Sequence, residues 1–201
     1  MSTEKPQPVT RALILASTSR YRAQLLNRLG IEYSARNPAV DESARVGESP
    51  RARALRLADA KAEVLAVQFP AAVVIGGDQV PAVNTTMLDK PGNAVNCREQ
   101  LKLLSASTAE FYTACTVRCV ETGLRVSHVD TTAVKLRPLS DAEIDRYIER
   151  EKPFDCAGGF KAEALGITLF ERIDSEDPTA IVGLPLIWLS GALRTAGYKA
   201  P

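Results

Sequence analysis

The apolar and polar positions near the start of the chain predict a strand that leads directly into a helix. Residues 13–16 are uniformly apolar, and residues 17–19 are small and carry hydroxyl groups. The segment that follows is basic and amphipathic, with leucines spaced for one face of a helix. Ser19 is suited to cap this helix and Gly30 to end it. We therefore expect a buried strand, a polar turn and a helix that packs on the core.

A second helix and a central strand are predicted further along. Ser49 is followed by Pro50, a pair typical of a helix start, and the helical pattern then continues until Pro70. Residues 71–75 form a short, continuously apolar run, which is typical of a strand buried on both faces. We expect this strand to end at Gly76-Gly77-Asp78, where the two glycines would let a ligand approach the backbone and the carboxylate.

The second half of the chain predicts a long hairpin with a helix before it and a helix after it. Residues 110–120 and 124–136 have the pattern of two strands, joined by a turn at residues 121–123. Asn93 is suited to cap the preceding helix. Ser140 opens the following helix with the spacing of a capping box.

The last predicted helix follows Gly183-Leu184-Pro185, and we expect Ile187 and Leu189 among its inner residues. Helices that alternate with strands around one long hairpin favour an α/β fold with a mixed central sheet and flanking helices. We interpret residues 11–197 as a single domain and residues 1–10 as a disordered N-terminal extension.

Composition and charge restrict the classes of partner. The 201 residues have a net charge of +1 and a pI near 7.6, so affinity for phosphate must come from a local cluster of basic residues. No stretch approaches the roughly 20 apolar residues of a membrane helix, and the first residues lack the apolar region of a signal peptide. We expect a cytoplasmic protein that binds neither nucleic acid nor membrane.

The four cysteines and the single histidine favour structural roles. The cysteines include no Cys-x-x-Cys pair, so a structural zinc site is not expected. Cys115 and Cys119 are four positions apart in a predicted strand, and we interpret both as buried free thiols. His128 falls on the polar face of the other hairpin strand and is interpreted as structural or exposed.

The turn between the first strand and the first helix has the features of a phosphate-binding site. The first N–H groups of a helix have no partner within the helix, and the helix dipole adds partial positive charge there. Ser17 adds a hydroxyl donor, and Arg22 offers a planar guanidinium to phosphate oxygens. Taken alone, the segment fits an ordinary capped surface helix with solvated arginines equally well.

Two carboxylates and two lysines are further candidates, and local sequence leaves the role of each open. Asp78 follows two glycines, where either a metal ligand or a solvated turn residue is compatible with the pattern. Glu42 is suited to a hard cation, and Asp41 beside it is a competing choice. Lys61 and Lys90 individually do not differ from solvated surface lysines.

Six short segments that follow the first turn in a fixed order give a more specific signal. They are Val40-Asp41-Glu42, Lys61, Ile75-Gly76-Gly77-Asp78-Gln79-Val80, Lys90-Pro91, Ala157-Gly158-Gly159-Phe160-Lys161 and Gly183-Leu184-Pro185-Leu186. Together with the first turn, they resemble the Maf family of nucleoside triphosphate pyrophosphatases, from Ala12 to Leu193. The resemblance implies a catalytic domain that cleaves the α–β phosphoanhydride to give a monophosphate and pyrophosphate. It also implies two lobes around a cleft, in a fold related to that of inosine triphosphatase.

The resemblance further implies a role for each candidate residue. Asp78 would be the general base and a metal ligand, and Glu42 would be a second ligand of a divalent cation such as Mg²⁺ or Mn²⁺. Arg20 departs from the family pattern, which more often has proline at this position. The residues implied at the triphosphate are Ser17, Arg22, Lys61 and Lys90.

Within this family, the combination of Tyr21, Gln79 and Glu163 resembles that of the subgroup that acts on 7-methyl-GTP. Methylation at N7 makes guanine cationic, and such a ring stacks well on an aromatic face such as that of Tyr21. Glu163 could accept from the N–H groups of the guanine edge.

Other substrates and another class of function stay open at this point. The same reaction on dTTP, UTP or another modified nucleotide is one alternative, although the subgroup for dTTP and UTP usually has Arg, Thr and Gln at these three places. A non-catalytic nucleotide-binding regulator is an alternative of a different class, because the family is also associated with septum formation. A homodimer is left open.

Overall fold

The computed structural model describes residues 11–199, and the predicted extension of residues 1–10 lies outside the described residues. In chain order the elements are β1 (Leu13–Ala16), α1 (Arg20–Asn27), β2 (Ser34–Arg36), α2 (Pro50–Gln68), β3 (Val73–Val83), β4 (Thr86–Met87), α3 (Ala94–Leu104), β5 (Thr108–Cys119), β6 (Leu124–Leu136), α4 (Asp141–Glu151), the 3₁₀ helix η1 (Leu165–Leu169), β7 (Phe170–Asp174), the 3₁₀ helix η2 (Ala180–Val182) and α5 (Leu186–Thr195). None of the helices between residues 11 and 199 combines the length and apolar composition needed to cross a bilayer.

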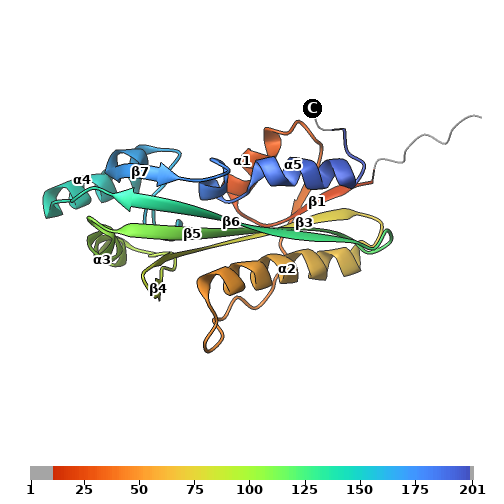
Figure 1. Cartoon of the computed structure of the whole chain (residues 1–201), viewed down its shortest axis with the longest axis horizontal. Coiled ribbons are helices and arrows are strands. Elements are labelled where there is room, and N and C mark those ends of the chain that lie inside the picture. Colours follow the sequence, from red (N-terminus) through yellow and green to blue (C-terminus); the bar gives the residue numbers. More distant parts are fainter. Residues whose placement is uncertain (1–10, 200–201) are drawn as a thin grey trace, which may run out of the picture.

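One mixed sheet organises these elements, which confirms the predicted fold class. Its strand order is β2-β1-β3-β5-β6-β7, and β4 pairs with β3 beside this path. β1 is parallel to β2 and β3, whereas β3, β5, β6 and β7 are antiparallel to their successive neighbours. In Figure 1, α2 covers one face of the sheet, and α1 and α5 cover the opposite face.

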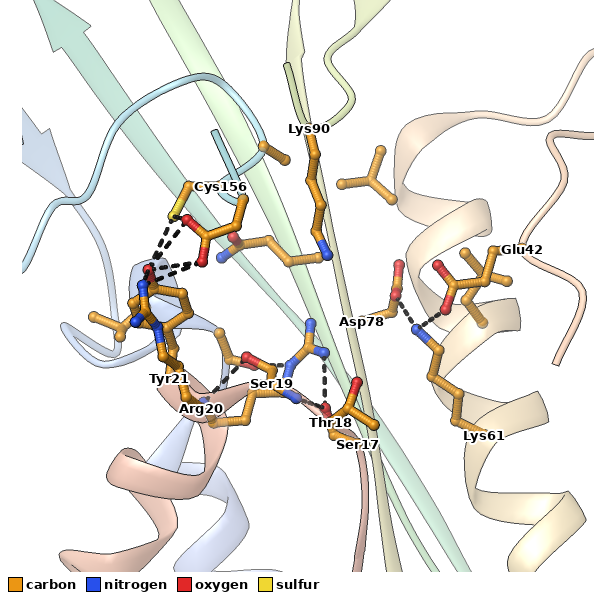
Figure 2. Close-up of a pocket in the computed structure, with 18 of the residues that line it drawn as sticks. Ser17, Thr18, Ser19, Arg20, Tyr21, Glu42, Lys61, Asp78, Lys90 and Cys156 are labelled. Atoms are coloured by element: carbon orange, nitrogen blue, oxygen red, sulfur yellow. Dashed lines mark hydrogen bonds and ion pairs between the residues drawn. The ribbon is translucent and has the colours of Figure 1, made fainter. Parts of the chain in front are cut away.

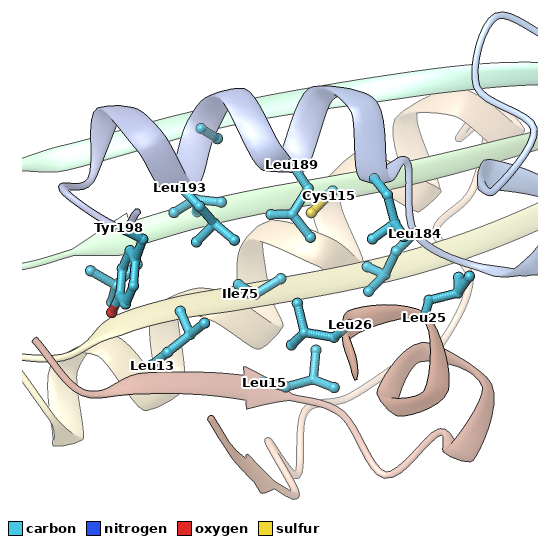
Figure 3. Packing of buried hydrophobic residues seen from close by; sticks show 14 of the residues in the cluster. Leu13, Leu15, Leu25, Leu26, Ile75, Cys115, Leu184, Leu189, Leu193 and Tyr198 are labelled. Atoms are coloured by element: carbon cyan, nitrogen blue, oxygen red, sulfur yellow. The ribbon is translucent and has the colours of Figure 1, made fainter. Parts of the chain in front are cut away.

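Two large hydrophobic clusters mark two lobes along the long hairpin, and smaller clusters lie between α2 and the sheet. At one end, residues of β1, α1, β3 and α5 pack around Ile75, as Figure 3 shows. At the other end, α3, α4 and η1 pack around Phe111. Figure 1 shows β5 and β6 passing through both ends, and β5 contributes to both clusters, with Phe111 in one and Cys115 in the other.

The central strand differs from the prediction at a place that matters for the site. β3 does not end at Asp78 but continues to Val83, because β5 pairs with it without interruption from Val74 to Val83. Asp78 therefore projects from the middle of a paired strand. The prediction that Gly76 gives a ligand access to this strand is also wrong, since a Cβ at Gly76 would overlap the Ala58 carbonyl oxygen of α2. The missing side chain allows α2 to pack closely on the sheet.

The helix starts follow the sequence closely. The side chains of Ser19, Ser49 and Asn93 each accept a hydrogen bond from a backbone N–H in the first turn, as predicted. The capping box of α4 is also present, and hydrogen bonds from Ser140 lower the pKa of Glu143 to about 2.

The inner face of α5 is the exception among the helices. Ile187 is 64% exposed, so its predicted inner position is wrong, whereas Leu186, Leu189 and Leu193 are buried. The helix begins at Leu186, and the spacing from that residue turns positions 189 and 193 toward the sheet and position 187 away from it. Cys115 and Cys119 are both buried free thiols, as predicted.

Candidate active site

A cleft of about 830 Å³ opens between the two lobes, and it collects all the predicted site residues. Its walls come from the start of α1, the loop before α2, the faces of α2 and β3, the loop after β4 and the two segments that follow α4 and β7. Figure 2 shows many of these side chains pointing into one space. The predicted residues that line it are Ser17, Tyr21, Arg22, Glu42, Lys61, Asp78, Gln79, Lys90 and Glu163.

The predicted phosphate seat is built around Arg22. Its Nε donates to the Gly183 carbonyl oxygen at 3.0 Å, and its Nη1 lies 3.4 Å from the Ser17 hydroxyl. Ser17 also accepts from the N–H of Ser19, which caps α1. Gly77 lies beside this group, and a Cβ there would lie 3.1 Å from Leu184 Cδ2, so the missing side chain lets Leu184 pack closely on β3. Within residues 11–199 no carboxylate pairs with Arg22, so its charge is available to an anion beside the helix start.

On the opposite wall, Lys61 is held between two carboxylates. Its Nζ is 2.7 Å from Asp78 Oδ1 and 2.7 Å from Glu42 Oε1. The Lys61 and Asp78 side chains are only 7% and 10% exposed. Partial burial raises the pKa of Glu42, but the hydrogen bond and the charge of Lys61 outweigh burial and bring the pKa below its ordinary value. Lys61 is therefore a buried, paired cation, unlike a solvated surface lysine.

The two carboxylates that converge on Lys61 also fit a divalent cation of the magnesium type. Mg²⁺ is commonly bound by one or two carboxylates together with substrate phosphates and water. Glu42 and Asp78 supply such a pair in the cleft. Both carboxylates already contact the same cation, the ammonium group of Lys61. Within the described residues no third carboxylate, histidine or cysteine completes a protein-only metal site. Phosphate and water ligands would have to complete the coordination.

The remaining predicted residues line other parts of the cleft. Lys90 extends into the cleft from the loop after β4 (Figure 2). Tyr21 lies in the first turn of α1, and Glu163 is an exposed residue on the wall that follows α4. Gln79 lies on β3, and its amide nitrogen donates to Thr113 and to two carbonyl oxygens of η2. Its observed contacts thus anchor η2, while its role in substrate specificity stays a prediction.

Several residues that the sequence did not single out shape the same cleft. Arg53 of α2 reaches the Glu42 carbonyl oxygen at 3.2 Å and Asp89 at 3.7 Å, and it thereby joins the loops that hold Glu42 and Lys90. Asp155 lies on the cleft wall beside Tyr21. An arginine on an amphipathic helix and an aspartate in a loop give no local signal of such contacts. Only the position of Asp155 next to the Ala157–Lys161 segment hinted at the site.

Comparison with known proteins places the chain in a family. A family model described as a Maf-like protein matches residues 12–196. The chain is 48% identical over 193 residues to the 7-methyl-GTP pyrophosphatase of Albidiferax ferrireducens, covering 96% of this chain and 97% of that protein. It is 50% identical over 189 residues to the 7-methyl-GTP pyrophosphatase of Xanthomonas oryzae pv. oryzae, covering 94% and 98%.

A solved structure, that of the Staphylococcus aureus Ham1 protein, is similar with a TM-score of 0.45 and 14% identity, covering 63% of this chain and 72% of that one. At this level the relation to the inosine triphosphatase fold stays a prediction. The family match, in contrast, extends over nearly all of the described residues and includes the whole cleft. The chain belongs to the family of Maf-like proteins.

Proposed function

We propose that this protein hydrolyses a nucleoside triphosphate at the α–β phosphoanhydride and releases a nucleoside monophosphate and pyrophosphate. The observation that carries the proposal is the meeting of three cationic side chains and two carboxylates in one cleft. A triphosphate needs several positive groups to bind, and hydrolysis needs a positioned water with a base. The names of the similar proteins from Albidiferax and Xanthomonas support the same reaction. The five side chains are Arg22, Lys61, Lys90, Glu42 and Asp78.

The phosphates bind, in this proposal, between the start of α1 and the lysines. The free N–H groups of α1 and the guanidinium of Arg22 donate to phosphate oxygens. The ammonium groups of Lys61 and Lys90 offset the charge that remains on the triphosphate. The hydrogen bond from Arg22 to Gly183 fixes the guanidinium before substrate arrives, so little reorganisation accompanies binding.

Asp78 is proposed as the general base. Its carboxylate accepts a proton from a water molecule whose oxygen forms a bond to the α-phosphorus. The bond from that phosphorus to the bridging oxygen breaks, and pyrophosphate leaves with the electron pair. Lys61 holds Asp78 Oδ1 in place at 2.7 Å. A divalent cation such as Mg²⁺ or Mn²⁺, held by Glu42 and Asp78, would neutralise phosphate charge as a Lewis acid.

The proposed substrate is 7-methyl-GTP. Tyr21 offers an aromatic ring at the end of the cleft away from Lys61, and a cationic purine stacks on such a ring more strongly than a neutral base. Glu163 lines the same cleft, on the segment that follows α4, and offers a carboxylate to the N–H edge of guanine. The identity of about half of all residues to proteins named 7-methyl-GTP pyrophosphatase supports this choice over dTTP or UTP.

The experiment mixes the purified protein with 7-methyl-GTP, GTP, dTTP or UTP in the presence of Mg²⁺ or Mn²⁺, and measures pyrophosphate and orthophosphate separately. We expect equal amounts of monophosphate and pyrophosphate, the highest kcat/KM for 7-methyl-GTP, and no turnover in excess chelator. The Asp78→Asn variant is the control for a contaminating phosphatase.

Three outcomes would contradict the proposal. Direct release of orthophosphate would show that the protein does not cleave the α–β phosphoanhydride. Nucleotide binding without turnover would favour a non-catalytic regulator. A preference for dTTP or UTP would replace the substrate and leave the pyrophosphatase reaction in place.

A further inference from the structure

A contact between the two lobes closes one end of the cleft. Arg20 and Tyr21 lie in the first turn of α1, and Asp155 and Cys156 lie in the loop after α4. Arg20 Nη2 is 3.3 Å from Asp155 Oδ2, and the Tyr21 hydroxyl is 3.1 Å from the same oxygen. Cys156 Sγ is 3.6 Å from the Tyr21 hydroxyl. Figure 2 shows Arg20, Tyr21 and Cys156 gathered at this place, away from Lys61.

This contact already contains a cation on an aromatic ring beside a carboxylate. The guanidinium carbon of Arg20 lies 4.8 Å from the centre of the Tyr21 ring. Partial burial raises the pKa of Asp155, but hydrogen bonds, first among them that from Tyr21, outweigh burial and bring the pKa below its ordinary value. Asp155 is therefore negatively charged at neutral pH, and Arg20 is its ion-pair partner.

We propose that Asp155 is a specificity-determining residue for a cationic nucleobase, and that Arg20 occupies the position of that base in the free protein. This inference rests on the proposed function, because it assigns the recognition of the base in the same cleft. A methylated purine displaces Arg20 from the Tyr21 ring and brings its own positive charge next to Asp155. A neutral purine displaces the same arginine but leaves Asp155 without a cation. Discrimination thus arises from the exchange of one cation for another.

Asp155 is better placed for this role than the sequence-predicted Glu163. The Asp155 carboxylate accepts a hydrogen bond from the Tyr21 hydroxyl. It is therefore held at the edge of the ring on which the base would stack. Glu163 is exposed and, within residues 11–199, its side chain has no hydrogen bond or ion pair that fixes it near Tyr21. The two carboxylates therefore make different predictions, which substitution can separate.

The exchange predicts opposite effects for the two charged partners. Asp155→Asn removes the negative charge and should reduce the preference for a methylated base. Arg20→Met removes the competing cation and leaves Asp155 unpaired, so it should increase the preference. If the contact only held the lobes together, both variants should change the preference for a methylated base in the same direction. In the double variant the preference should fall to the level of Asp155→Asn alone.

The test measures the binding of 7-methyl-GMP and GMP by calorimetry without metal, so that neither turnover nor phosphate chemistry contributes. The readout is the ratio of the two Kd values in the wild type, the two single variants and the double variant. We expect each single substitution to change this ratio about two- to fivefold, in opposite directions, as for a partly exposed charge pair. Asp155→Ser is a second variant should Asp155→Asn fold poorly.

A matched control exists outside the cleft. Arg172 and Asp174 form an ion pair at 2.8 Å with side chains 70% and 55% exposed, close to the 65% and 51% of Arg20 and Asp155. The Arg172→Met and Asp174→Asn variants should leave the Kd ratio unchanged. Glu163→Gln tests the alternative carboxylate.

The failure of this inference is distinguishable from the failure of the proposed function. A wild type that prefers 7-methyl-GMP, with a ratio unaffected by Asp155→Asn, overturns the inference alone. A shift of the ratio in the same direction for Arg20→Met and Asp155→Asn also overturns it. A wild type without preference for the methylated base overturns both the inference and the proposed substrate. Opposite shifts in a protein that releases no pyrophosphate support the inference while the proposed reaction fails.

Discussion

The two ends of the cleft hold their charged side chains in different ways. At the phosphate end, Lys61 and Asp78 are buried and joined at 2.7 Å, and Arg22 is tied to the backbone of Gly183. At the base end, Arg20 and Asp155 are more than half exposed, and they meet at 3.3 Å across the gap between the lobes. The Lys61–Asp78 pair is buried, whereas the Arg20–Asp155 pair is a contact between surface residues.

This difference separates the chemistry from the choice of base. Buried charges keep their geometry and act in a medium of low polarity, where they stabilise a developing charge strongly. Exposed pairs contribute little to stability and are easily exchanged for another partner. Substitutions at the phosphate end should therefore reduce turnover by large factors, and substitutions at the base end should change the preferred nucleotide by small ones.

The largest effect is expected for Asp78→Asn. An amide keeps the shape of the side chain but is a poor proton acceptor, so kcat should fall about 10²- to 10⁴-fold. Circular dichroism should show an unchanged fold, because Lys61 keeps Glu42 as a partner. A variant with near-normal kcat would exclude Asp78 as the base and weaken the contrast between the two ends.

The next effect is expected for Arg22→Met, which keeps the aliphatic part of the side chain. Loss of a preorganised cation should reduce transition-state stabilisation by about 2 to 4 kcal/mol, measured as kcat/KM for every nucleotide alike. Arg28→Met is the control, because Arg28 is exposed at the other end of the same helix. Equal kinetics in the two variants would remove Arg22 from the phosphate seat.

A smaller effect is expected for Tyr21 at the base end. Tyr21→Ala should reduce kcat/KM for 7-methyl-GTP about two- to thirtyfold, the range of a cation–π contact. Tyr21→Phe keeps the ring and should cost less, although it removes the hydrogen bond to Asp155. If both variants lower kcat/KM equally for 7-methyl-GTP and dTTP, the ring does not select the base.

The smallest effect concerns stability and pH. The folded protein lowers the pKa of Glu42 below its ordinary value of 4.5, so the contact with Lys61 stabilises the fold above that pH. This contribution is lost as the pH falls through the lowered pKa. Urea unfolding of the wild type and Glu42→Gln should therefore differ at pH 6 and converge toward pH 3. A difference that grows on acidification would contradict the assigned pair.

The sequence predicted local features well and long-range contacts poorly. Ser19, Ser49 and Asn93 cap helices where expected, because capping depends on a few adjacent residues. The position of Asp78 in mid-strand could not be predicted, since the length of β3 depends on pairing with the distant β5.

The same limit applies to individual side chains of the site. The burial of Lys61 depends on the packing of α2 against β3, which no spacing within the helix reveals. The contact of Asp155 with Tyr21 joins residues 134 positions apart. The family resemblance brought most site residues together, but it did not indicate which of them are paired.

The passage of β5 and β6 through both lobes has a consequence for the mechanics of the protein. The two strands pair continuously from Thr108 with Lys135 to Cys119 with Leu124, so one hydrogen-bonded ladder belongs to both cores. Neither lobe can detach without breaking that ladder, and thermal denaturation should proceed as one cooperative transition. A relative displacement of the two cores would accordingly have to twist or bend this hairpin, because its two strands run through both of them.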